Sequence, residues 1–112
     1  MRKAALLLAL IALILVSGCV QSSENQQNAS SNSVEISNFA YSPQEVTVKV
    51  GDTVTWTNMD SAIHTVTSDN GNELDSATLS QGDTYSHTFE SAGTYDYHCT
   101  IHPYMKGKVV VE

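Results

Sequence analysis

The sequence predicts an all-β fold, a Greek-key β-sandwich of roughly seven to eight short strands between residues 34 and 112. Three observations support this prediction. Polar and apolar residues alternate with a period of two in several runs, these runs are rich in β-branched and aromatic residues, and turn residues separate them. No segment of 34–112 has a convincing helical period, and 72–80 would hold one helical turn at most.

Residues 1–18 read as a lipoprotein-type signal peptide. Arg2 and Lys3 precede the apolar run 4–16, and small residues follow it up to Cys19. This run is too short to span a bilayer, which takes roughly 20 apolar residues. The stretch "VSGC" resembles the lipobox of prokaryotic lipoproteins, which implies that Cys19 becomes the lipidated first residue of the mature chain. Ordinary secretion with cleavage nearby is the alternative.

Residues 19–33 are expected to form the lipidated cysteine and a flexible tether. The segment is rich in Ser, Asn and Gln, so it buries too little apolar surface to fold. It contains a sequon for N-glycosylation at Asn28, a weak signal where Asn and Ser are so common. Cys19 and Cys99 are poor candidates for a disulfide, because one lies at a flexible terminus and the other in a metal-like motif.

The charge of the mature chain bears on its partners. Removal of Arg2 and Lys3 leaves three lysines against 12 acidic residues, which moves the net charge from −7 to −9. This charge argues against nucleic acid and anionic lipid as ligands and favours protein partners with basic docking faces. We expect the chain to act as a monomer.

The folded domain is expected to start near Val34, and two alternating runs follow in its first part. In "VTVKV" (46–50) the three valines share one face, and Thr47 and Lys49 lie on the other. After the turn Gly51-Asp52, "TVTWT" alternates again and points Val54 and Trp56 inward.

The later strands carry aromatic residues on one face. "TYSHTF" (84–89) places His87 on the same face as Tyr85 and Phe89, and "TYDYHC" (94–99) places Cys99 on the same face as its tyrosines. The last strand, "GKVVVE", directs Val109 and Val111 to the core.

A cluster of soft ligands follows the fourth of these runs. Cys99, His102 and Met105 have the spacing Cys-x2-His-x2-Met, and a compact loop after a strand can direct all three side chains to one point. Thiolate, imidazole and thioether together suit copper, and a blue-copper centre needs a second histidine. That histidine has to come from another part of the chain.

Strand geometry separates the three remaining histidines. His98 adjoins Cys99 on an extended strand, so their side chains point to opposite faces and His98 is expected to face solvent. If 91–93 turns a hairpin, His87 lies opposite about Asp96, roughly 10 Å from Cys99 along the strand, too far to share its metal. His87 then reads as a core or edge residue.

His64 is better placed than either. It follows the polar turn 57–63 and opens the run "HTVTS", and the strand before that turn can bring it to the end of the sandwich where Cys99 lies. Each ligand also has an ordinary reading, because a lone Cys or Met is commonly a core residue and a lone His a loop residue. All four residue types together match one copper geometry.

Two stretches, "NFAYSPQEVTVKVGDTVTWTNMDSAIHTV" and "GTYDYHCTIHPYMKGKVVVE", resemble the amicyanin and plastocyanin branch of the cupredoxins, small type 1 blue-copper proteins with halocyanin-like membrane-anchored relatives. The resemblance covers about residues 34–112, and "CTIHPYM" matches the short amicyanin loop. It implies one copper ion with His64, Cys99 and His102 as strong ligands and Met105 as the axial ligand. The chain departs from the family where His64 follows Ile63 instead of proline.

The resemblance implies a mononuclear electron carrier that cycles between Cu(I) and Cu(II), without enzymatic activity. A multicopper enzyme would need more histidine clusters and a further domain. Copper storage or delivery outside the cytoplasm is an alternative function, but its usual signature of many Met or paired Cys is missing. An adhesive sandwich with incidental ligands is a third. We expect the carrier at the outer face of the cytoplasmic membrane, held through lipid on Cys19.

Residues around the ligand loop have two further expected roles. An apolar patch around His102 would dock redox partners, although its tyrosine could equally be loop packing; the patch comprises Ala62, Ile63, Ile101, Pro103 and Tyr104. The N–H of Thr65 is expected to donate to the Cys99 sulfur, whereas Pro103 has no N–H and can only stiffen the loop.

Overall fold

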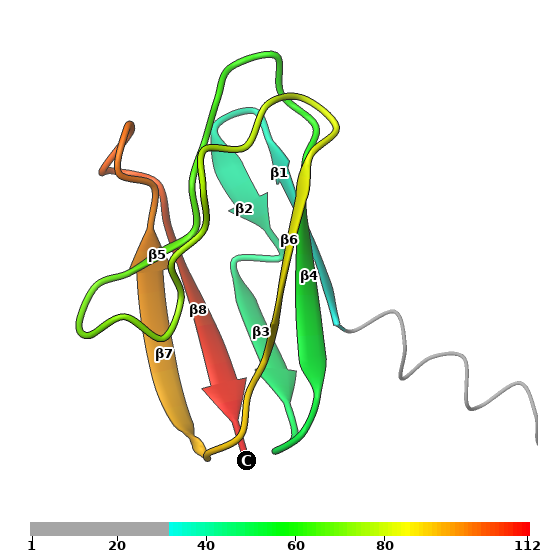
Figure 1. Cartoon of the computed structure of the whole chain (residues 1–112), viewed down its shortest axis with the longest axis vertical. Coiled ribbons are helices and arrows are strands. Elements are labelled where there is room, and N and C mark those ends of the chain that lie inside the picture. The colour runs from blue at the N-terminus through cyan, green and yellow to red at the C-terminus, as the bar shows by residue number, and fades with distance from the viewer. Residues whose placement is uncertain (1–31) are drawn as a thin grey trace, which may run out of the picture.

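The computed structural model describes residues 32–112, which form two four-stranded β-sheets packed face to face (Figure 1). The predictions for 1–18, for Cys19 and Asn28, and for most of the tether lie outside the described residues. Within residues 32–112 there is no helix long and apolar enough to cross a membrane. The strands are β1 (Ser33–Ser37), β2 (Ala40–Ser42), β3 (Glu45–Val48), β4 (Thr53–Asn58), β5 (Thr67–Ser68), β6 (Thr84–Thr88), β7 (Gly93–His98) and β8 (Lys106–Val111).

The strand order confirms the predicted sandwich. One sheet has the order β2-β1-β4-β6 and the other β3-β8-β7-β5. β1 pairs with β4 and β3 pairs with β8 in parallel, and the remaining neighbours are antiparallel. The connections that follow β1, β4 and β7 lie at the same end of the molecule (Figure 1). That end therefore collects residues that are far apart in the sequence.

The core lies between the two sheets and follows the predicted alternation. Val54, Trp56, Val109 and Val111 are all buried. The rings of Trp56 and Tyr97 meet edge to face with centroids 5.5 Å apart, and the Trp56 indole N–H donates to the Tyr97 hydroxyl at 3.1 Å. This bond satisfies the polar atoms of two large rings in the apolar interior.

Two details of the strands differ from what the sequence pattern suggests. Val50 is 49% exposed, because β3 ends at Val48 and the chain turns through Gly51 with φ 94°. The segment 91–93 does not close a hairpin, because β6 pairs with β4 in one sheet and β7 with β8 in the other. Residues 89–93 therefore carry the chain from one sheet to the other.

The long connection between β5 and β6 contains no helical turn. Its apolar residues Leu74 and Leu79 are buried in the core, and its backbone forms isolated bridges from Leu79 to His64 and from Asp75 to Thr67. The connection thus covers the open edge of the sandwich and fixes the backbone at His64.

Candidate metal centre

The structure brings His64, Cys99 and His102 together from two separate segments. Cys99 directly follows β7, and His102 lies in the loop before β8. His64 lies between β4 and β5, where its N–H donates to the Leu79 carbonyl at 3.1 Å and its carbonyl accepts the Leu79 N–H at 2.8 Å. Both parts of the cluster are thus fixed by backbone hydrogen bonds.

The donor atoms of the cluster surround a common point. The Cys99 Sγ lies 3.8 Å from His64 Nδ1 and 3.7 Å from His102 Nδ1, and all three donor atoms lie within 4.8 Å of one another. Metal bonds of roughly 2.1 Å to nitrogen and 2.3 Å to sulfur, about 120° apart, separate the donors by about 3.8 Å. The two sulfur–nitrogen distances therefore fit a single metal ion bound by all three side chains.

Burial differs among the four predicted ligands. His64 and Cys99 are fully buried and Met105 is 2% exposed, whereas His102 is half-buried. The loop is closed by its own backbone, because the Cys99 N–H donates to the Met105 carbonyl at 3.2 Å and the Met105 N–H to the His102 carbonyl at 2.9 Å. His102 thus offers an edge to the surface while the other donors are shielded.

Thr65 links the two ligand segments beside the sulfur. Its N–H lies 3.4 Å from the Cys99 Sγ, the contact expected from the sequence, and its hydroxyl accepts the Thr100 N–H at 2.9 Å. Its carbonyl accepts the buried Tyr41 hydroxyl at 2.6 Å. Hydrogen bonds of this kind orient metal ligands and tune their basicity.

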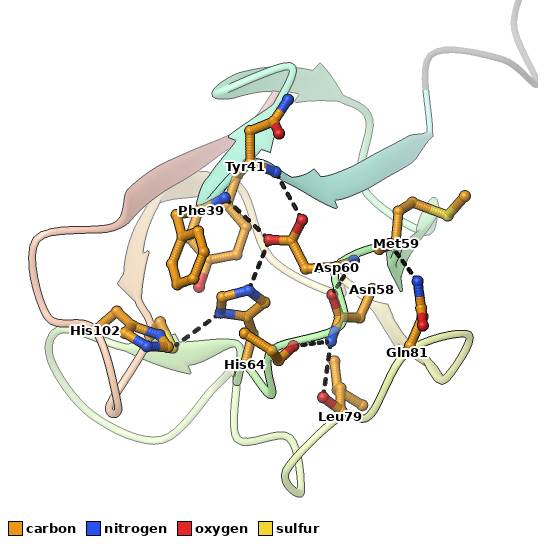
Figure 2. A network of polar contacts seen from close by, with 12 residues as sticks. Phe39, Tyr41, Asn58, Met59, Asp60, His64, Leu79, Gln81 and His102 are labelled. Atoms are coloured by element: carbon orange, nitrogen blue, oxygen red, sulfur yellow. Dashed lines mark hydrogen bonds and ion pairs between the residues drawn. The ribbon is translucent and has the colours of Figure 1, made fainter.

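Asp60 contacts the far side of His64, a role that the sequence analysis missed. Its Oδ2 lies 2.9 Å from His64 Nε2, and the carboxylate also accepts the N–H groups of Asn38 at 2.8 Å and Phe39 at 3.0 Å (Figure 2). Burial alone would raise the pKa of Asp60, but the hydrogen bonds from Phe39, Asn38 and His64 together outweigh it and lower that pKa. The spacing of four residues between Asp60 and His64 was the only signal in the sequence.

Phe39 is the second missed residue. Its ring meets the His64 ring at a centroid distance of 5.2 Å and the His102 ring at 4.9 Å, both edge to face, yet Phe39 remains 42% exposed. Its backbone and that of Asn38 are left-handed, with φ 59° and 55°. A pattern of alternating strands gives no indication of such a turn.

His87 and His98 lie outside the cluster. His87 is partly exposed and contacts Glu73 at 2.6 Å, and His98 is partly exposed and contacts Asp69 at 2.6 Å. His98 is partly exposed, in line with its expected outward position, and it also pairs with Asp69. His87 was placed by a hairpin that does not exist, and its actual partner strand is β4, where it faces Val54.

The residues expected to form an apolar patch surround His102. Ile63, Ile101 and Tyr104 are 45%, 41% and 70% exposed, Pro103 is exposed and Ala62 is half-buried. The Tyr104 ring lies 6.2 Å from the His102 ring. The partly exposed Phe39 ring also contacts the His102 imidazole.

The molecule is a two-sheet sandwich that carries two imidazoles and one thiol close together at one end. This combination of fold and donor set defines a metal-binding protein of cupredoxin architecture. The family model of the cupredoxin-like domain matches residues 6–111. The chain belongs to this family, on the branch that contains amicyanin and plastocyanin.

Individual relatives place the chain within that branch. It is 48% identical to amicyanin of Paracoccus denitrificans over 83 residues, which cover 70% of this chain and 63% of that protein, so it spans less than two thirds of that relative. It is 43% identical to amicyanin-alpha of Methylorubrum extorquens over 75% of this chain and 74% of that protein. The crystal structure of amicyanin from Paracoccus versutus matches with a TM-score of 0.68 and 39% identity, covering 71% of this chain and 79% of that one.

Proposed function

We propose that this chain is a mononuclear type 1 blue-copper electron carrier. His64, Cys99 and His102 would be the strong ligands of one copper ion and Met105 the axial ligand. The observation that carries the proposal is the common point defined by two Nδ1 atoms and one Sγ within 4.8 Å of one another. A related amicyanin has been solved in its Cu(I) form.

Copper, when bound, supplies a one-electron couple, and the protein supplies a donor set that changes little between the two states. Cys99 and His64 are held by backbone bonds to Met105 and Leu79, so their positions do not depend on the metal. Burial excludes water from both. A site fixed in this way limits the rearrangement that slows electron transfer.

The half-buried His102 suggests where electrons enter and leave. Its imidazole lies within the apolar patch formed by Ala62, Ile63, Ile101, Pro103 and Tyr104, which would contact redox partners transiently. The negative charge of the chain favours partners with basic docking faces and disfavours nucleic acid. We further propose that the carrier works as a monomer.

The domain organisation proposed for the whole chain is a signal peptide over 1–18, a lipidated Cys19 with a tether to residue 33, and the copper domain over 34–112. Such a carrier would operate at the outer face of the cytoplasmic membrane. The tether would let the copper domain reach partners while its anchor stays in the bilayer.

Copper titration of the purified full chain, with optical spectra and voltammetry, tests the function. We expect one copper per chain, an intense thiolate-to-Cu(II) charge-transfer band and a reversible one-electron wave. A chain that binds one copper and remains colourless would overturn the blue-copper assignment. Rapid loss of copper to a weak acceptor would favour the alternative of copper storage or delivery.

A further inference from the structure

One carboxylate joins two loops of the metal centre, the turn that follows β1 and the segment that follows β4. Asp60 accepts hydrogen bonds from His64, which is a member of the donor cluster, and from the two backbone N–H groups of the turn between β1 and β2 (Figure 2). That turn carries Phe39, whose ring lies against the rings of both histidines edge to face and is called their cover below. A single side chain thus contacts a ligand and holds the cover over the ligands.

The turn needs such an anchor because of its backbone. Asn38 and Phe39 are consecutive left-handed residues, with φ 55° and 59°, and this conformation is unfavourable for residues that carry a Cβ atom. The Asp60 carboxylate satisfies both N–H groups at 2.8 and 3.0 Å. Without it, the turn loses the contacts that direct the aromatic ring toward the imidazoles.

The same carboxylate determines which nitrogen of His64 carries the proton. An ionised carboxylate only accepts hydrogen bonds, so Nε2 must donate to Asp60. The lone pair is then left on Nδ1, the atom that lies 3.8 Å from the Cys99 sulfur. Hydrogen bonding of the outer ring nitrogen to a carboxylate fixes the tautomer and raises the basicity of a metal-binding histidine.

Asp60 is itself held in place by a buried neighbour. The side-chain oxygen of Asn58 accepts the Asp60 N–H at 2.9 Å, and its amide nitrogen donates to the carbonyls of Ala62 and Leu79. Asn58 is fully buried at the end of β4. The carboxylate is therefore positioned by the sheet rather than by solvent.

We propose that Asp60 is a positioning residue that couples the electronic state of the copper site to its cover. It would hold His64 in the tautomer that binds the metal, strengthen the donation of that imidazole to Cu(II), and keep the Phe39 ring over both histidines. The proposal rests on the proposed blue-copper function. It predicts that one substitution changes two properties that are otherwise separate, the reduction potential and the rate of copper release.

The test compares Asp60→Ala, Asp60→Asn, Phe39→Ala and the double variant Asp60→Ala with Phe39→Ala in the full chain. Asp60→Asn keeps the side-chain volume and serves if Asp60→Ala does not fold. Asp52→Ala is the matched control. Asp52 also accepts a backbone N–H in a turn, but it lies just before β4, at the opposite end of that strand from Asp60. Voltammetry and copper release to a Cu(I) chelator are measured for each.

We expect both Asp60 variants to raise the reduction potential and to speed copper release. Phe39→Ala should speed copper release with a smaller effect on the potential, and Asp52→Ala should change neither. If the two residues act together, the increase in release rate in the double variant should be smaller than the product of the two single-variant increases. The shortfall should be at least about twofold, the size expected for residues in contact. Independent effects of the two substitutions, or a potential unchanged in both Asp60 variants, would overturn the proposal.

The metal-free chain distinguishes this proposal from the proposed function. The ¹⁵N shifts of His64 should show a proton on Nε2 in the wild type and in Phe39→Ala, and a mixture of tautomers in Asp60→Ala. If the wild type bound no copper, the blue-copper assignment would fail while this readout still reported on Asp60. A His64 tautomer unaffected by Asp60→Ala would contradict the positioning role directly.

Discussion

Cys99 has a place in the structure that no other side chain can fill. It is the free cysteine of the described residues, it is fully buried, and it receives the Thr65 N–H at 3.4 Å. The two histidine Nδ1 atoms lie 3.7 and 3.8 Å from its sulfur. In the proposed blue-copper centre, the colour and the redox behaviour would therefore depend on this one thiol.

Cys99→Ser should abolish the intense charge-transfer band, because an alkoxide or hydroxyl does not replace a thiolate in that transition. The fold should survive, since Ser is close in size and the sandwich core is unchanged. Optical spectra with circular dichroism measure both properties. His87→Ala and His98→Ala are the controls and should retain the band, because both histidines pair with surface carboxylates outside the cluster. A blue band in the Cys99→Ser protein would refute the ligand assignment.

Pro103 lies in the ligand loop and carries no N–H that could reach the sulfur. Pro103→Ala restores that donor, which would stabilise the electron-rich thiolate and weaken its donation to Cu(II). We expect the reduction potential to rise by roughly 40 mV, since a hydrogen bond of about 1 kcal/mol converts to that value for one electron. If voltammetry shows an unchanged or lower potential, proline serves only to stiffen the loop.

At the scale of elements, the pairing of β7 with β8 depends on a glycine. Gly107 faces Tyr97 across the two strands, and a Cβ atom at Gly107 would lie 2.3 Å from the Tyr97 ring. Glycine within a strand commonly marks such a close approach. The ring of Tyr97 consequently occupies the space that a side chain would take, two residues before Cys99.

Gly107→Ala should destabilise the domain by about 1–3 kcal/mol, the usual effect of an added methyl group in a packed interior. Urea unfolding followed by tryptophan fluorescence measures it, because Trp56 contacts the displaced Tyr97 ring. Lys106→Ala, on the exposed side of the same strand, is the control and should stay within about 0.5 kcal/mol of the wild type. Equal stability of the two variants would show that the strands adjust without strain.

The elements also show what the sequence could and could not predict. Alternation identified the strands and their buried faces because a half-buried strand repeats every two residues, as in Val54 and Trp56. It could not identify which strands pair. The placement of His87 assumed a hairpin at 91–93, where the chain in fact changes sheets. Pairing is decided by contacts across the core, and alternation within one strand contains no information about them.

The metal centre was predictable to a similar degree. Ligand spacing and family resemblance pointed to His64, Cys99 and His102, which the structure brings together. Asp60 and Phe39 were missed, because their positions depend on a left-handed turn and on the packing of two loops from different strands. Residues that act through such tertiary contacts leave no periodic signal.

At the scale of the whole molecule, buried tyrosines make stability sensitive to alkali. Burial raises the pKa of Tyr97 to about 12, and the hydrogen bond from Trp56 offsets this only in part. The pKa of Tyr41 is also raised above its usual range, mainly by burial and to a lesser extent by the nearby Cys99 and Tyr97. Each hydroxyl thus resists ionisation in the folded state more than in the unfolded state.

Their contribution to stability is therefore fully present below pH 10 and is lost as the pH rises toward 12 and beyond. For Tyr97 alone the loss should reach about 3 kcal/mol, since each pKa unit corresponds to about 1.4 kcal/mol. Urea unfolding at several values between pH 9 and 11.5 tests this. Tyr97→Phe should show a shallower decline over the same range, and a free energy of unfolding that is constant across it would contradict the argument.

The proposed anchor sets where the whole molecule resides. A single acyl chain binds a membrane only marginally, so stable retention requires two or more chains on Cys19. Mass spectrometry of the mature protein should find them, and Cys19→Ser should move the protein from the membrane fraction to the soluble fraction. An unmodified mature N-terminus in the wild type would contradict lipidation.

The loop from Cys99 to Met105 is closed by its own backbone bonds, whereas His64 is fixed by Leu79, on the far side of the long β5–β6 connection. Three of the four proposed donors therefore belong to one loop, and their relative positions are set within it. An insertion or deletion inside that loop would thus displace three proposed donors together, whereas His64 would keep the position that its bonds to Leu79 give it.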